Sequence, residues 1–192
     1  MKPGKTDQIF LMTLGGMLVS ILIGFIFFST SIFSPTQSNF QFVAYGFMGA
    51  LFFSLLEYKS LKEQVWGIIL ILFLNLIMFT GRSLSITYLI RDVFFIGSLI
   101  LSVKLYYQFI KKNPQIKFYL RSFALALIYG LINTACGIIV YMVNAKAGFP
   151  PMEFIYIMAR YGILIGLGIG LGTDFYFQNK KQLTGWLGIK TA

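Results

Sequence analysis

The chain has 192 residues, of which 57% are hydrophobic and 18% aromatic, whereas only 11% are charged. A soluble domain usually carries about a quarter charged residues, so lipid is the expected solvent for most of this surface. The length suits one compact bundle and leaves no room for a separate soluble domain. The net charge of +10 does not indicate a nucleic-acid partner, because the basic residues lie in short segments between apolar runs.

The composition also excludes several kinds of chemistry. The chain has no histidine and one cysteine, Cys136, which lies within an apolar run. These counts exclude histidine-ligated haem or metal, Ser-His catalysis and a disulfide framework. The motifs of P-loop proteins, zinc proteases and serine hydrolases are also absent. We therefore expect no cofactor, no metal and no enzymatic activity, although a lipid transferase that uses arginine and aspartate stays open as a third interpretation.

Six apolar stretches have the character of membrane helices, since a spanning helix needs about 20 mostly apolar residues. The runs are continuously apolar, whereas membrane β-strands would alternate in polarity. The expected fold is therefore an all-α integral membrane protein, a single domain over residues 1–192 with six transmembrane helices. These cover residues 9–29, 40–56, 65–80, 88–110, 122–143 and 154–177, followed by a tail at 178–192.

Lysine and arginine predict the orientation. The odd-numbered loops hold only Arg82 and Lys146, whereas eleven basic residues lie at the chain ends and in the second and fourth loops. By the positive-inside rule, both termini face the cytoplasm of a bacterial inner membrane, and Trp186 anchors the tail at the inner interface. The eleven residues are Lys2, Lys5, Lys59, Lys62, Lys111, Lys112, Lys117, Arg121, Lys180, Lys181 and Lys190.

Three of the four arginines oppose this trend, because they fall on the predicted outer side. A guanidinium near the apolar layer is costly unless it meets a partner, an anion or water, and its planar fork suits carboxylate or phosphate. We therefore predict an outward-facing site for a small anionic solute or lipid headgroup. Its expected residues are Arg82, Arg91, Arg160, Tyr88, Tyr156 and Asn133.

Less specific interpretations of these residues stay open. The arginines can snorkel to outer headgroups, or pair internally with the nearby carboxylates Asp92 and Glu153. The two tyrosines also fit an interfacial aromatic belt. Asn133, near the middle of its helix, also fits an interhelical hydrogen bond.

Small residues recur at intervals of four in the first and last helices, and such ladders let helices approach closely in lipid. In the last helix a second glycine pair lies on another face, which predicts a central helix that packs on more than one side. The first-helix ladder fits either intramolecular packing or docking of a partner subunit. The ladders are Gly16, Ser20 and Gly24, then Gly162, Gly166 and Gly170, with Gly168 and Gly172 as the second pair.

This layout is similar to that of the substrate-binding components of energy-coupling-factor vitamin transporters, which are small basic bundles, typically of six helices, with cytoplasmic termini. The resemblance implies that Gly16, Ser20 and Gly24 contact a membrane coupling subunit, although the family's usual residue there is alanine. The expected function is that of a transporter or of its substrate-binding component. The alternative is a structural, regulatory or sensor subunit of a larger membrane complex.

Overall fold

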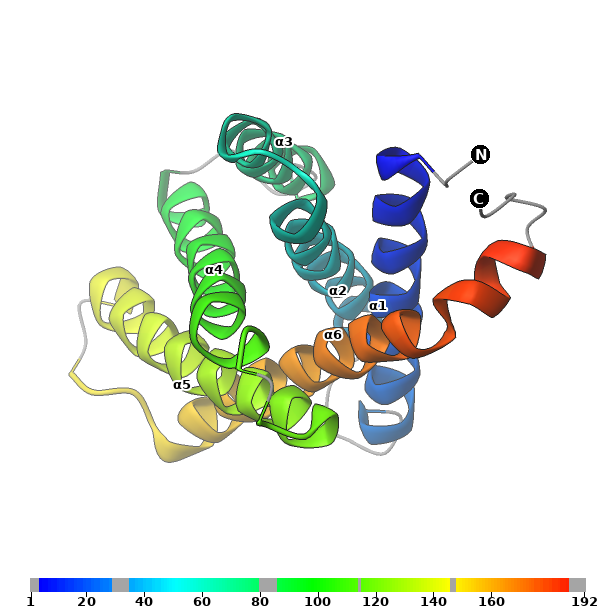
Figure 1. Ribbon diagram of the computed structural model, residues 1–192. Helices are drawn as coiled ribbons and strands as arrows, with labels where there is room; N and C mark the ends of the chain where they lie inside the picture. Colours follow the sequence, from blue (N-terminus) through cyan, green and yellow to red (C-terminus); the bar gives the residue numbers. More distant parts are fainter. Residues whose placement is uncertain (1–3, 29–34, 80–85, 114, 146–147, 187–192) are drawn as a thin grey trace.

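The structure, a computed structural model, describes residues 4–28, 35–79, 86–113, 115–145 and 148–186. These residues form six α-helices and one π-helical segment, which confirms the all-α class and the six helices. Figure 1 shows α1 (Lys5–Phe28), α2 (Pro35–Tyr58), α3 (Leu61–Phe79), α4 (Ile86–Leu105), η1 (Tyr106–Lys111), α5 (Phe118–Ala145) and α6 (Met152–Trp186).

Within the described residues, four helical segments are long and apolar enough to cross a membrane. They are Lys5–Phe27, Ile90–Lys111, Leu120–Val143 and Met152–Trp186, and a shorter apolar stretch covers Val43–Tyr58. Large apolar side chains cover the outer faces, since Phe25, Trp66 and Leu131 are each more than half exposed. This surface would be poorly solvated by water and is suited to lipid. Length, composition and surface therefore point to a multi-pass membrane protein.

The last helix is longer than the hydropathy pattern predicts. Its apolar part ends near Phe177, yet the helix continues to Trp186. Residues 178–184 contain no proline, and their glutamine and lysine side chains favour helix. The first half of the predicted tail is therefore helical, and the exposed indole of Trp186 lies at the helix end.

Helix α6 lies between α1 and α5 and packs against both, as Figure 1 shows. The α1–α6 contacts run in opposite order along the two helices, so the pair is antiparallel. Lys180 donates a 2.8 Å hydrogen bond to Gln8 near the start of α1. Further along, Ser20 packs directly on Gly168.

Both faces of α6 depend on glycine for this close approach. A Cβ built on Gly172 would lie 2.4 Å from the Cα of Gly16 on α1. On the other face, a Cβ on Gly166 would lie 2.9 Å from the Cα of Ala126 on α5. Neither gap can hold a side chain, because the obstructing atoms are backbone. The predicted central position of the last helix, with two packed glycine faces, is confirmed.

A third ladder, which the sequence analysis missed, completes the packing around α1. On α2 the small residues Gly46, Ala50 and Ser54 recur at intervals of four. A Cβ on Gly46 would meet the Ser20 side chain, and the hydroxyls of Thr13 and Ser54 lie 3.1 Å apart. The ladder of α1 therefore packs within the chain, against α2 and α6.

Because neighbouring helices are antiparallel, the start of one helix lies beside the end of the next, at each of the two ends of the bundle. Ser122 at the start of α5 bonds to Asp174 in the last third of α6, and Lys180 lies over the ring of Tyr58 at the end of α2. We call this the lysine end. At the opposite, arginine end, the end of α5 meets the start of α6 through the Tyr141 and Phe154 rings, 5.1 Å apart.

Gly172→Ala should destabilise the protein by about 1–3 kcal/mol, because the new methyl group overpacks two backbones. The matched control is Gly97→Ala, where a Cβ meets nothing within 4 Å, and which should be neutral or stabilising by up to about 1 kcal/mol. Thermal unfolding in detergent gives both values. Equal stabilities for the two variants would contradict the packing described for α1 and α6.

Glu63 caps the start of α3. Its carboxylate accepts 2.9 Å hydrogen bonds from both the N–H and the hydroxyl of Ser60, and lies 3.3 Å from the ammonium group of Lys59. This is one half of a capping box, in which the N3 carboxylate reaches back to the N-cap backbone. The bonds from Ser60, together with Lys59, favour the ionised form and lower the pKa of Glu63 from 4.5 to about 2.

The lowered pKa predicts the pH at which this cap is lost. The cap contributes its full stability above the ordinary pKa of 4.5, and the contribution falls as the pH drops towards about 2. Side-chain NMR of Glu63 should show a midpoint near 2 in the parent. In Ser60→Ala the midpoint should rise only part of the way towards 4.5, because the backbone N–H of residue 60 and the Lys59 ammonium group remain. A parent midpoint at the ordinary value would show that the cap does not form.

Candidate functional site

Arg91, in the second turn of α4, is bound to its chain neighbour Asp92. The Nε and Nη2 atoms of the guanidinium donate hydrogen bonds of 3.1 and 3.0 Å to one carboxylate oxygen. This ion pair is the internal pairing considered for Arg91. It neutralises a cation that would otherwise be costly near the apolar layer.

The other residues of the predicted outer site have different surroundings. Arg160 donates from Nη2 to the carbonyl oxygen of Phe27, at the end of α1. Asn133 is fully buried and donates a 2.9 Å hydrogen bond to the carbonyl of Met158, so it joins α5 to α6 as an interhelical bond. Tyr156 is 66% exposed. Arg82 and the side chain of Tyr88 lie outside the described residues.

Asn133 contacts the turn of α6 that carries Tyr156 and Arg160, whereas Arg91 lies on another helix, α4. The first turns of α4 and α6, the helices that carry Arg91 and Arg160, lie well apart in Figure 1. Arg160 joins α6 to the end of α1, whereas the ion pair of Arg91 with Asp92 lies within α4. The outer anion site therefore stays a prediction from the sequence.

At the lysine end, the structure brings together five polar side chains from three segments. Asp174 of α6 is only 5% exposed, although it lies in a helix apolar enough to span a membrane. Its Oδ2 accepts a 2.8 Å hydrogen bond from the hydroxyl of Ser122 on α5. Electrostatic interactions link the carboxylate to Lys111 and Tyr106 of η1 and to Arg121 of α5. We call these five residues the polar centre.

Lys111 reaches the polar centre over aromatic surface. Its ammonium group lies 3.8 Å from the centroid of the Phe177 ring and 5.8 Å from that of Phe53. Such cation–π contacts partly offset the loss of water around a lysine. Glu57, near the end of α2, is a second carboxylate that interacts with this ammonium group.

The π-helical segment turns two side chains of the centre to the same side. In an α-helix, residues 106 and 111 would point about 140° apart, because each residue turns about 100°. The i→i+5 pattern of a π-helix instead stacks the later residue near the earlier one. Tyr106 and Lys111 accordingly share a neighbour, Phe53, whose ring centroid lies 5.7 Å from that of Tyr106.

The charged groups of the polar centre face one another without contact. Neither Lys111 nor Arg121 comes within 4.0 Å of a carboxylate oxygen of Asp174. The Tyr106 hydroxyl and the Arg121 Nε are buried and have no hydrogen-bond partner among the described residues. Buried polar groups in proteins are normally hydrogen-bonded, often through water or a bound group. Water or a bound acceptor would satisfy these two donors.

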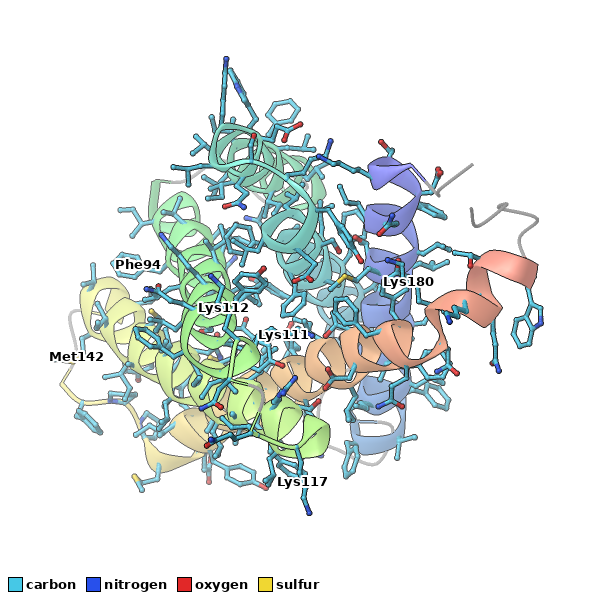
Figure 2. All side chains as sticks on the ribbon, viewed as in Figure 1. Phe94, Lys111, Lys112, Lys117, Met142 and Lys180 are labelled. Atoms are coloured by element: carbon cyan, nitrogen blue, oxygen red, sulfur yellow. The ribbon has the colours of Figure 1, made fainter. Side chains whose placement is uncertain are left out.

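The surrounding surface is basic. Figure 2 shows Lys111 towards the middle of the view, Lys180 beside α1, and Lys112 nearby, whereas Lys117 projects outward. Lys112 lies 5.5 Å from the centroid of the Tyr107 ring. This end would attract anions by its summed charge. Metal binding has no comparable support, since no three His, Cys, Asp or Glu side chains gather among the described residues.

The sequence contains one signal for this centre. Asp174 is the one carboxylate between Glu153 and the end of α6, and an ionisable residue inside a membrane helix is a functional candidate by default. Lys111 and Arg121 were counted as loop charges that set the orientation. The side of η1 that carries Tyr106 could not be assigned, because 3.6-residue periodicity does not apply there.

No protein-family model, curated protein or solved structure matches this chain. The candidate site therefore depends on the chemistry of its own residues.

Ser122→Ala should destabilise the protein by about 1.5–3 kcal/mol, the usual range for a hydrogen bond to a charged group. The change removes the only hydroxyl that bonds to Asp174 among the described residues. Ser102→Ala is the matched control, because its buried hydroxyl bonds to a carbonyl of its own helix, that of Ser98. Chemical unfolding measures both. A loss at Ser122 no larger than at Ser102 would contradict the bond to Asp174.

Proposed function

We propose that this chain is a multi-pass membrane protein that binds the anionic group of a small solute or lipid headgroup at the polar centre, as a transporter or as its substrate-binding component. The observation that carries the proposal is the gathering of Lys111, Arg121 and Tyr106 around Asp174, with the Tyr106 hydroxyl and the Arg121 Nε buried and without a hydrogen-bond partner among the described residues. Each of the three can donate a hydrogen bond, and two are cations. A phosphate or carboxylate supplies the acceptor oxygens that suit them.

The burial of Asp174 and Tyr106 favours a ligand-binding role for the polar centre over a purely structural one. A charge in a membrane-spanning segment is expensive, and such residues usually mark a substrate or ion pathway. Asp174 could be replaced by an apolar residue without loss of the glycine contacts that hold α6. Lys111 is partly buried and lies over the ring of Phe177, whereas a lysine that served only to set orientation would need no such contact.

We propose six membrane spans, with the lysine end in the cytoplasm of a bacterial inner membrane. The alternating arrangement of helix ends and the excess of basic residues at this end support that orientation. The binding site then opens to the inner side, whereas the outer arginines Arg91 and Arg160 serve mainly in internal contacts. An inner site fits the release or capture of a solute on the cytoplasmic side.

The alternative is a structural, regulatory or sensor subunit without a solute of its own. Its predicted docking face on the first helix includes Gly16 and Ser20, which pack against α2 and α6. A partner on that face would have to displace these helices. A subunit without a solute of its own would also have no use for the polar centre. The binding function is therefore the better supported of the two proposals.

The test measures anion binding to the full chain in a neutral detergent. Radiolabelled sulfate serves as the probe for a free anion, and short-chain phosphatidylglycerol, with phosphatidylcholine as its control, for a headgroup. Lys111→Met and Arg121→Gln should each weaken binding by about 10- to 100-fold, the equivalent of one hydrogen bond to a charged group. Displacement of bound sulfate by phosphatidylglycerol, but not by phosphatidylcholine, would identify the headgroup as the ligand.

Two controls separate the polar centre from general charge. Lys181→Gln removes an exposed cation of the same end and should leave the affinity unchanged. Arg160→Gln tests the outer site predicted from the sequence. The proposal fails if neither probe binds the parent, or if Lys181→Gln weakens binding as much as Lys111→Met. Loss of binding in Arg160→Gln alone would move the site to the arginine end.

A further inference from the structure

We infer that Asp174 is a proton-binding residue that couples proton uptake to anion binding, so that the bound anion and one proton occupy the polar centre together. This inference rests on the proposed function, to which it adds a second ligand, the proton. The observation behind it is the position of one buried carboxylate beside the same cations that would hold the anion.

Two of the elements packed around Asp174, η1 and α5, supply the polar groups that face it. From η1 come Lys111 and Tyr106, and from α5 come Arg121 and Ser122. Helix α1 faces this turn of α6 with glycine, since Gly15 and Gly16 contact Gly172 and Thr173. Helix α2 contributes Glu57, which acts on Lys111, and Tyr58, which acts on Tyr176.

Whether the Asp174 carboxyl group is ionised or protonated determines how strongly Lys111 and Arg121 can attract an anion. With Asp174 ionised, its negative charge competes with an incoming anion for Lys111 and Arg121. With Asp174 protonated, both cations are available to the anion and the repulsion is removed. The neutral carboxyl group can also still bond to Ser122, because a protonated carboxyl keeps acceptor capacity and gains a donor.

Linkage then fixes the sign of the pH dependence. If an anion binds better to the protonated form, its binding must promote uptake of one proton from water by the Asp174 carboxylate. Release of the anion returns that proton to water. Affinity should therefore rise as the pH falls, by up to about tenfold per pH unit, which is the limit for one linked proton.

The experiment measures the Kd of sulfate for the full chain in detergent from about pH 5 to about pH 8, a range that excludes titration of lysine and tyrosine with ordinary pKa values. Sulfate is chosen because its own charge is constant there. The parent should bind more tightly at the acidic end. Asp174→Asn, which mimics the protonated carboxyl, should bind about tenfold more tightly than the parent at the alkaline end, with no pH dependence.

Matched controls use the other carboxylates. Asp92→Asn removes the partner of Arg91 at the arginine end and should leave both the affinity and its pH dependence unchanged. Glu57→Gln removes the second carboxylate near Lys111 and should retain the pH dependence. Loss of the pH dependence in Glu57→Gln, with its retention in Asp174→Asn, would assign the proton to Glu57 and overturn the inference.

A second measurement keeps the inference testable if Asp174→Asn does not fold. Sulfate added to the parent protein in weakly buffered solution should raise the pH, with uptake of up to one proton for each anion bound. Sulfate binding without proton uptake and without pH dependence would refute the coupling but leave the proposed function intact. Absence of sulfate and phosphatidylglycerol binding at every pH would instead refute the proposed function itself.

Discussion

The close packing of α6 between α1 and α5 is the constraint on which the rest of the structure depends. Glycines on both faces of α6 let three backbones approach where no side chain fits. The same approach positions the polar centre, because a Cβ on Gly170 would lie 2.9 Å from the Cα of Ser122. Asp174 follows one helical turn later on that face. Its 2.8 Å bond to Ser122 therefore requires glycine at the preceding turn.

The charged side chains are paired differently at the two ends of the bundle. At the arginine end, Arg91 is neutralised by Asp92, its neighbour in the chain. At the lysine end, the partly buried Lys111 and Arg121 lie near the buried Asp174 without direct contact. Partly separated charges of this kind can exchange partners when a ligand binds or leaves. That property is useful for binding and transport, whereas a closed ion pair mainly adds rigidity.

Sequence patterns predicted the scaffold better than the site. Intervals of four between glycines correctly placed the last helix at the centre, because close backbone packing requires small residues at that spacing. The ladder of α2 was missed because Ala50 and Ser54 are less distinctive than glycine. The polar centre was missed because Lys111 and Arg121 fit the positive-inside rule. Only the π-helical turn and the antiparallel α5–α6 packing bring these residues to Asp174.

The central claim is that one anion binds among Lys111, Arg121 and Tyr106, beside Asp174. An experimental structure of the protein with selenate, a heavier analogue of sulfate, tests it most directly, since anomalous scattering locates the selenium. The account predicts a selenium peak within hydrogen-bonding reach of the three donors. A peak beside Arg160 or Arg91, or an empty polar centre under saturating selenate, would contradict it.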